Sequence, residues 1–182
     1  MRNVQTGLDA CAAVPIVGFS APSGTGKTTL LRAVLVLLRE RGLRVGVIKQ
    51  ARDDFDVDVP GTDSFELRRA GIEATVIASD RQSALICERP ESIDPELSSL
   101  LPEFAMDDVD LILVEGFSDQ PFPKIELFRG QDQPRYLKDP WIIALATDCK
   151  LPYEPPIPLL EINDPAAVAD FLAARVFLRN SD

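Results

Sequence analysis

The stretch that decides the fold is PIVGFSAPSGTGKTTLL, from Pro15 to Leu31. A short apolar run with β-branched residues enters a loop that contains Gly24 and Gly26, and a long apolar segment follows the loop directly. This order predicts a strand, a phosphate-binding loop and a helix. Glycines let successive backbone N–H groups turn inward and form an anion site at the helix N-terminus.

Two side chains at the end of the loop extend the prediction to a nucleoside triphosphate. Lys27 supplies a mobile positive charge for the β- and γ-phosphates, and the Thr28 hydroxyl is placed to ligate Mg²⁺. The usual motif begins with Gly where this chain has Ala21, which is small enough to follow the strand without blocking the loop. An ordinary turn fits these residues less well, because Lys-Thr directly follows the second Gly and both flanks are of the predicted type.

Composition favours one globular domain with a small-molecule ligand. The chain has 182 residues, of which 46% are hydrophobic, and we expect a flexible extension over residues 1–14 and a single domain over 15–182. A formal net charge of −10 argues against a nucleic-acid partner. No apolar run is long enough for a membrane span, and three scattered cysteines favour reduced thiols in the cytoplasm.

The remaining segments predict a three-layer α/β/α fold of the P-loop NTPase class with a mainly parallel central sheet. Residues 28–41 form an apolar helix and 43–49 a strand, which complete a right-handed βαβ unit. Asp63 with Glu66 predicts a capping box ahead of a short helix. Further strands are expected over 74–79, 83–88, 109–116, 124–128 and 141–148, and further helices over 95–104 and after Asp164.

Three acidic residues follow predicted strands, and the carboxyl ends of strands face the ligand in open parallel sheets. Glu115 ends a buried strand and can reach Mg²⁺, its water or an attacking nucleophile, although a surface Glu after a core strand fits the same run taken alone. Asp58 lies in the acidic segment 50–64, which fits a metal-proximal segment and a solvated turn equally well. Asp148 can accept the N1–H and N2–H of guanine, or can be a plain turn residue.

Several of these segments together resemble the molybdopterin-guanine dinucleotide biosynthesis protein B (MobB) family, GTP-binding P-loop proteins of the SIMIBI class. The likeness covers nearly the whole chain after about Pro15. It is carried by SGTGKTTLL (23–31), GVIK (46–49), DVDVPGTDSFELRRAG (56–71), DLILVEGF (110–117), KIELFR (124–129) and EIND (161–164). The phosphate loop alone fits many families, whereas its combination with the 56–71 and 110–117 segments is far more specific.

The resemblance implies an accessory protein with GTP and Mg²⁺ as cofactors and weak GTPase activity. It would assist the molybdenum cofactor guanylyltransferase, which joins GMP to molybdopterin; molybdopterin itself is a further candidate ligand, and a homodimer is implied. Lys27, Glu115 and Asp58 would be the catalytic residues, with Thr28 and Glu115 at the metal. The residues expected to bind the nucleotide are Ser23, Gly24, Thr25, Gly26, Lys27, Thr28, Thr29 and Asp148.

One departure from the family pattern lies after the second strand. The family typically has Lys-His there, whereas this chain has Lys49-Gln50 and no histidine at all. No arginine finger is evident, and P-loop proteins without one are typically slower by roughly 10³ to 10⁵, so we expect slow hydrolysis. Arg52 and Arg81 are candidates for that role.

Two other functions stay open at this point. An ATP-dependent small-metabolite kinase or ligase is the main alternative, but its longest candidate lid, residues 128–140, holds only three basic residues. The other is a pure adaptor in which the nucleotide merely stabilises the dimer.

Overall fold

The computed structural model describes residues 14–51, 55–71, 73–87, 94–104, 109–130 and 133–179. The described chain forms two compact units, the first from residues up to 50 and from 96 onward, the second from residues 51–95. The expected extension over 1–14, apart from Val14, and the candidate Arg52 lie outside the described residues. One domain over 15–182 stays a prediction.

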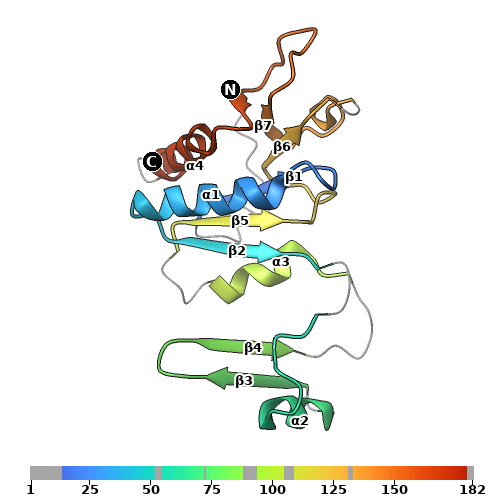
Figure 1. Ribbon diagram of the computed structural model, residues 1–182, viewed down its shortest axis with the longest axis vertical. Coiled ribbons are helices and arrows are strands. Elements are labelled where there is room, and N and C mark those ends of the chain that lie inside the picture. Colours follow the sequence, from blue (N-terminus) through green and yellow to red (C-terminus); the bar gives the residue numbers. More distant parts are fainter. Residues whose placement is uncertain are drawn as a thin grey trace. The chain divides into compact units, whose positions relative to one another are not determined.

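The described part of the first unit contains a six-stranded parallel sheet in the order β2-β5-β1-β6-β7-β8 (Figure 1). The central strands β1 and β5 are buried on both faces, and all their residues before the last one are therefore apolar or glycine. This sheet confirms the predicted α/β fold class. The strands are β1 (Ile16–Ser20), β2 (Val45–Lys49), β5 (Leu111–Glu115), β6 (Lys124–Phe128), β7 (Ile142–Thr147) and β8 (Leu159–Glu161).

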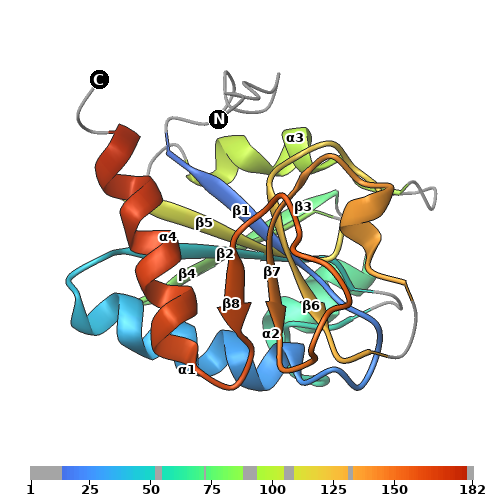
Figure 2. The same ribbon diagram turned by 90° about the horizontal axis from the view of Figure 1, so that it is seen from above.

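Helices cover both faces of this sheet, which gives three layers (Figures 1 and 2). On one face, α1 (Lys27–Glu40) and α4 (Pro165–Arg179) pack on the side chains of Val17 and Phe19. On the other face, the short α3 (Leu97–Leu100) and the 3₁₀ turn η1 (Leu101–Phe104) pack on Ile16 and its neighbours. Successive residues of β1 thus alternate between two cores, as strand geometry requires.

Helix α1 is buried on one face only, which its sequence pattern does not predict. Residues 28–41 are apolar nearly all round, yet α1 buries one face, formed by Leu30, Leu31, Val34 and Leu38, and leaves Val36 57% exposed. The sheet lies against one side of the helix only, so an apolar residue on the outer side stays in solvent.

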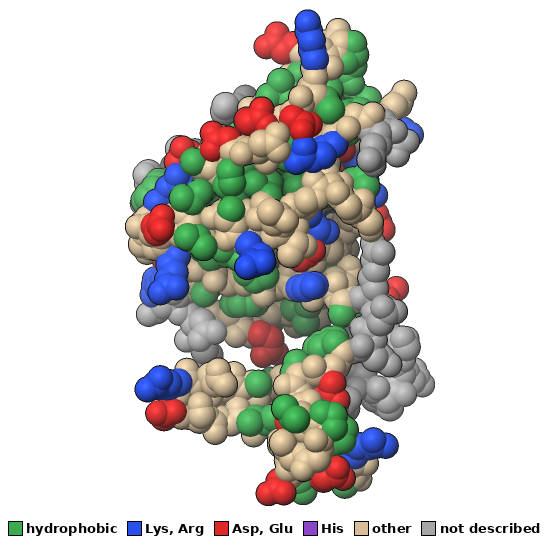
Figure 3. Space-filling model, viewed as in Figure 1, with side chains coloured by type: hydrophobic (Ala, Val, Ile, Leu, Met, Phe, Trp, Pro, Cys, Tyr) green, Lys and Arg blue, Asp and Glu red, His purple; other side chains and the backbone are tan. Residues whose placement is uncertain are grey.

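The second unit contains α2 (Asp63–Arg69) and an antiparallel hairpin of β3 (Ala74–Ala78) and β4 (Ser83–Cys87). The predicted cap is off by one residue, because Thr62 and not Asp63 accepts the hydrogen bond from the Phe65 N–H. None of the residues described in this unit is fully buried. Apolar side chains lie at its surface (Figure 3), with Val76 67% and Leu85 52% exposed.

Within the parts of the chain that the structure covers, no helix combines the length and the apolar character that a membrane crossing needs.

Candidate functional site

The phosphate loop lies between β1 and α1 and has the backbone of an anion site. Gly24 and Gly26 have φ angles of 81° and 90°, a region that L side chains rarely adopt, and a Cβ on either would meet no described atom within 4 Å. Gly26 is the N-cap of α1, and no described side chain caps that end. The first N–H groups of the helix are therefore available to an anionic ligand.

The predicted phosphate-binding residues come together in this loop. All of these residues except Thr25 and Lys27 are exposed. They are Ser23, Gly24, Thr25, Gly26, Lys27, Thr28 and Thr29. Thr25 is buried, and its hydroxyl donates to the Pro22 carbonyl at 2.8 Å. The Thr25 side chain thus holds the shape of the loop.

Lys27 and Glu115 lie together at the carboxyl edge of the sheet. Strands β1 and β5 pair in parallel with Phe19 opposite Glu115, so the phosphate loop and the end of β5 leave the sheet side by side. The Lys27 Nζ is 3.4 Å from the Glu115 Oε1, and the two side chains are 23% and 19% exposed. This places a positive charge and a carboxylate beside the uncapped glycine loop.

The oxygen donors at this edge fit a magnesium ion that arrives with a triphosphate. Mg²⁺ usually takes one or two carboxylates, phosphate oxygens and water. Thr28, in the first turn of α1, offers a hydroxyl and Glu115 offers a carboxylate. The described residues contain no group of three or more His, Cys, Asp or Glu that could hold a metal by themselves.

Gln50 has a structural role in the candidate site that the sequence pattern did not predict. Its backbone N–H donates to the Glu115 carbonyl at 2.8 Å, and its side-chain Oε1 accepts the Phe117 N–H at 2.7 Å. The turn that it holds is unusual, because Gly116 has a φ of 104° and Phe117 a φ of 53°. Gln50 therefore shapes the turn directly after Glu115. The only signal in the sequence is a Gly that follows the acid at the end of a buried strand.

Asp148 lies at the other end of the same edge. It lines a pocket of about 410 Å³ between the ends of β7 and β8, and its carboxylate pairs with Arg129. Burial acts to raise the pKa of the Asp148 carboxyl, but a hydrogen bond from Asn163 and the charge of Arg129 outweigh it, so the pKa lies below its ordinary value. The carboxylate is thus ionised at neutral pH and suited to accept N–H donors.

Asp58 belongs to the second unit and has a structural environment there. It accepts hydrogen bonds from the Val59 N–H at 2.9 Å and the Thr62 hydroxyl at 3.1 Å, and Arg68 lies 3.9 Å away. These contacts hold the turn that leads into α2. A catalytic role for Asp58 stays a prediction.

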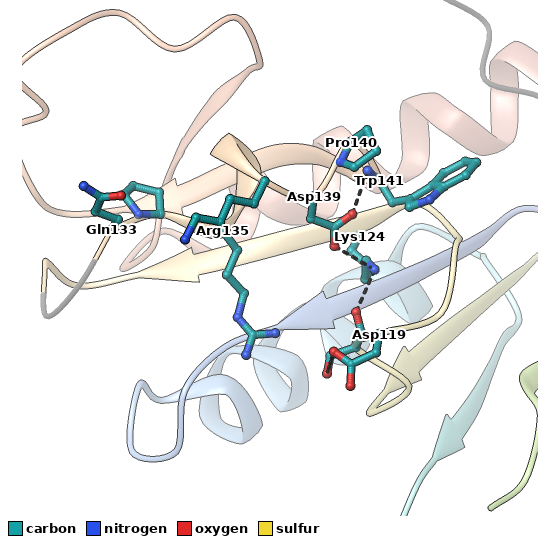
Figure 4. A pocket seen from close by; sticks show the side chains of 10 residues that line it. Asp119, Lys124, Gln133, Arg135, Asp139, Pro140 and Trp141 are labelled. Carbon is teal, nitrogen blue, oxygen red and sulfur yellow. Dashed lines mark hydrogen bonds and ion pairs between the residues drawn. The ribbon is translucent and has the colours of Figure 1, made fainter.

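A second pocket of about 390 Å³ opens beside β6 and contains none of the predicted site residues (Figure 4). Its Lys124 is buried, donates to the Ser118 and Gln120 carbonyls at 2.8 and 2.9 Å, and pairs with Asp139 at 2.9 Å. These contacts use all three ammonium protons. Arg135 points away from them and donates to the Ser20 hydroxyl at 3.3 Å, just ahead of the phosphate loop.

Known proteins resemble this chain over most of its length. The family model for "Molybdopterin guanine dinucleotide synthesis protein B" matches residues 16–148. The molybdopterin-guanine dinucleotide biosynthesis adapter protein of Escherichia coli is 43% identical over 162 residues, covering 87% of this chain and 91% of that protein. The adapter protein of the same name from Haemophilus influenzae is 37% identical over 160 residues, covering 87% and 88%.

A solved structure also resembles this one over most of its length. The crystal structure of Bacillus subtilis MobB superposes with a TM-score of 0.70 at 25% identity, covering 88% of this chain and 97% of that one. The segment that the family model matches, residues 16–148, contains the glycine loop, Glu115 and Asp148. The chain belongs to the molybdopterin guanine dinucleotide synthesis protein B family.

Proposed function

We propose that this protein is a GTP-binding adapter with weak GTPase activity that acts in the synthesis of the molybdopterin guanine dinucleotide cofactor. It binds GTP with Mg²⁺ and assists the guanylyltransferase that joins GMP to molybdopterin. The observation that carries the proposal is the Lys27–Glu115 pair beside an uncapped glycine loop at the carboxyl edge of the parallel sheet.

Each residue of this pair has a separate task. Lys27 moves from the Glu115 carboxylate to the β- and γ-phosphates, where its charge offsets theirs. The released Glu115 carboxylate would then orient the attacking water near the γ-phosphate or accept a proton from it. Thr28 and Glu115 would hold Mg²⁺, which spreads the negative charge that develops on the phosphate oxygens during transfer.

Guanine is the base that fits Asp148. The ionised Asp148 carboxylate lines the pocket between β7 and β8, and guanine presents two adjacent N–H donors on one edge. Adenine presents no such pair to a carboxylate. The adapter role comes from the E. coli and H. influenzae relatives, whose names state it.

A homodimer is part of the proposal. An isolated two-stranded hairpin is marginally stable in water, and the hairpin here exposes Val76 and Leu85. A second copy that covers these side chains would supply the missing burial. Sedimentation analysis of the whole chain tests this, and a monomer at micromolar concentration would contradict it.

The main experiment is isothermal titration of the whole chain with GTP and with ATP in the presence of Mg²⁺. We expect wild type to bind GTP more tightly than ATP, and Lys27→Ala to lose affinity for both. Lys138 is an exposed cation in another loop, so Lys138→Ala should keep the wild-type affinities. Equal affinity for the two nucleotides would overturn the guanine assignment. Rapid phosphorylation of a small acceptor by ATP would favour a kinase instead.

Reconstituted synthesis of the dinucleotide cofactor with the partner transferase tests the adapter role. Stimulation of the transferase by wild-type protein, but not by Lys27→Ala, is the expected result. Retained stimulation by Lys27→Ala would mean that the nucleotide only supports the dimer.

A further inference from the structure

Arg129 connects the two ends of the candidate nucleotide site. It follows directly after β6, whose carboxyl end lies between the ends of β1 and β7 in the sheet. Its Nε donates to the Thr25 carbonyl in the phosphate loop at 3.1 Å. Its Nη1 donates to the Asp148 carboxylate, and its Nη2 donates to the Asn163 side-chain oxygen at 3.0 Å. One guanidinium thus spans three separate segments of the chain.

These contacts leave the two oxygens of Asp148 in different states. The Oδ2 atom accepts from Arg129 and, at 3.4 Å, from the Asn163 side-chain amide. The Oδ1 atom accepts the weak Cys149 thiol donor at 3.6 Å, and the Asp148 backbone N–H also hydrogen-bonds the carboxylate. Asn163 is itself held at the end of β8, because its backbone N–H donates to the Glu161 carboxylate at 3.0 Å. Asp148 is therefore fixed through one oxygen and keeps acceptor capacity on the other.

We propose that Arg129 is a positioning residue that makes Asp148 selective for guanine and joins base recognition to the phosphate loop. The proposal rests on the proposed GTP binding and adds to it the residue that orients the base-reading carboxylate. Arg129 touches no base atom in this role. It acts through Asp148 and through the backbone of Thr25.

The shape of the side chain supports this role. A guanidinium is planar and offers five N–H donors in a fixed fork, so it can hold three acceptors in one plane. A lysine ammonium would keep the charge but not the fork. Without Arg129, the Asp148 carboxylate would rotate, and the Thr25 carbonyl would lose its link to the base end of the site.

The test is isothermal titration of GTP and ATP, each with Mg²⁺, into wild type and into Arg129→Ala, Arg129→Lys, Asp148→Ala and the Arg129→Ala/Asp148→Ala double variant. The readout is the ratio of the two affinities. We expect Arg129→Ala to lower this ratio by about tenfold, the effect of one charge-assisted hydrogen bond, with a smaller loss for ATP. Arg129→Lys should lower it nearly as far, and Lys138→Ala, a cation of the same connection, should not change it.

The double variant separates positioning from general damage. If Arg129 acts through Asp148, then Arg129→Ala changes the ratio no further once Asp148 is Ala. Equal losses of GTP and ATP affinity at a constant ratio would overturn the proposal and leave GTP binding itself standing. A wild type without preference for GTP would overturn the guanine assignment and this proposal with it. If Arg129→Ala does not fold, the ratio in Arg129→Lys decides.

Discussion

Replacement of Gln50 by Ala removes the acceptor for the Phe117 N–H, which lies at 2.7 Å from the Gln50 Oε1. Phe117 is only 3% exposed, so the donor would be left without a partner in the interior. A buried donor without a hydrogen-bond partner costs about 1–3 kcal/mol, and we take about 2 kcal/mol as the expected loss in the free energy of unfolding. The left-handed backbone of Phe117 costs about 1–2 kcal/mol, so relaxation of the turn would offset part of this loss and keep it below the upper end of the range.

Thermal unfolding measured by circular dichroism is the assay. For a chain of this length, about 2 kcal/mol corresponds to a Tm about 4–8 °C lower. Gln50→Glu keeps an acceptor of the same reach and should lose much less, whereas Gln50→Met keeps the length without the acceptor and should behave like Gln50→Ala. A Tm of Gln50→Ala and Gln50→Met equal to that of wild type would refute the reasoning.

Three further changes have defined outcomes. Gly116→Ala should lower the free energy of unfolding by at least about 2 kcal/mol in urea denaturation, because its φ is 104° and a Cβ there would lie 2.5 Å from the Gln50 Cβ; an unchanged midpoint would contradict this. Asp110→Asn removes an ion pair with Arg44, which hydrogen-bonds Asp110 and lowers its pKa below the ordinary 3.8. The pair therefore stabilises the protein by about 1 kcal/mol above pH 3.8. The difference in the free energy of unfolding between wild type and Asp110→Asn should vanish as the pH falls through the lowered pKa, and denaturation at several pH values measures it. Removal of Mg²⁺ by a chelator should weaken GTP binding in titrations, and Thr28→Ala should lose most of that dependence on Mg²⁺.

Local patterns explain why the fold class could be predicted. The runs that became β1, β5 and β7 are apolar up to their last residue, and the loop glycines stand between a strand and a helix, so each element could be recognised from its own residues. The errors also have local causes. Thr62 precedes an equally good capping residue, Asp63, and only the backbone geometry decides between them.

The candidate site was predictable only where it depends on neighbours in sequence. The phosphate loop and the placement of Glu115 at a strand end follow from the chain itself. Local patterns could not reveal the role of Gln50, because its partner Phe117 is 67 residues away. The role of Arg129 was equally hidden, since that side chain contacts Thr25, which lies 104 residues earlier.

The sequence by itself determined that this chain has a glycine loop between a strand and a helix of a parallel α/β fold, because glycine conformation and strand periodicity are properties of adjacent residues. The tertiary structure alone decided what surrounds that loop. It set Lys27 beside Glu115, fixed the turn after Glu115 with Gln50, and joined the phosphate loop to Asp148 through Arg129. Parallel strands bring distant segments to one edge, and contacts made there depend on strand order and register, which no local pattern encodes.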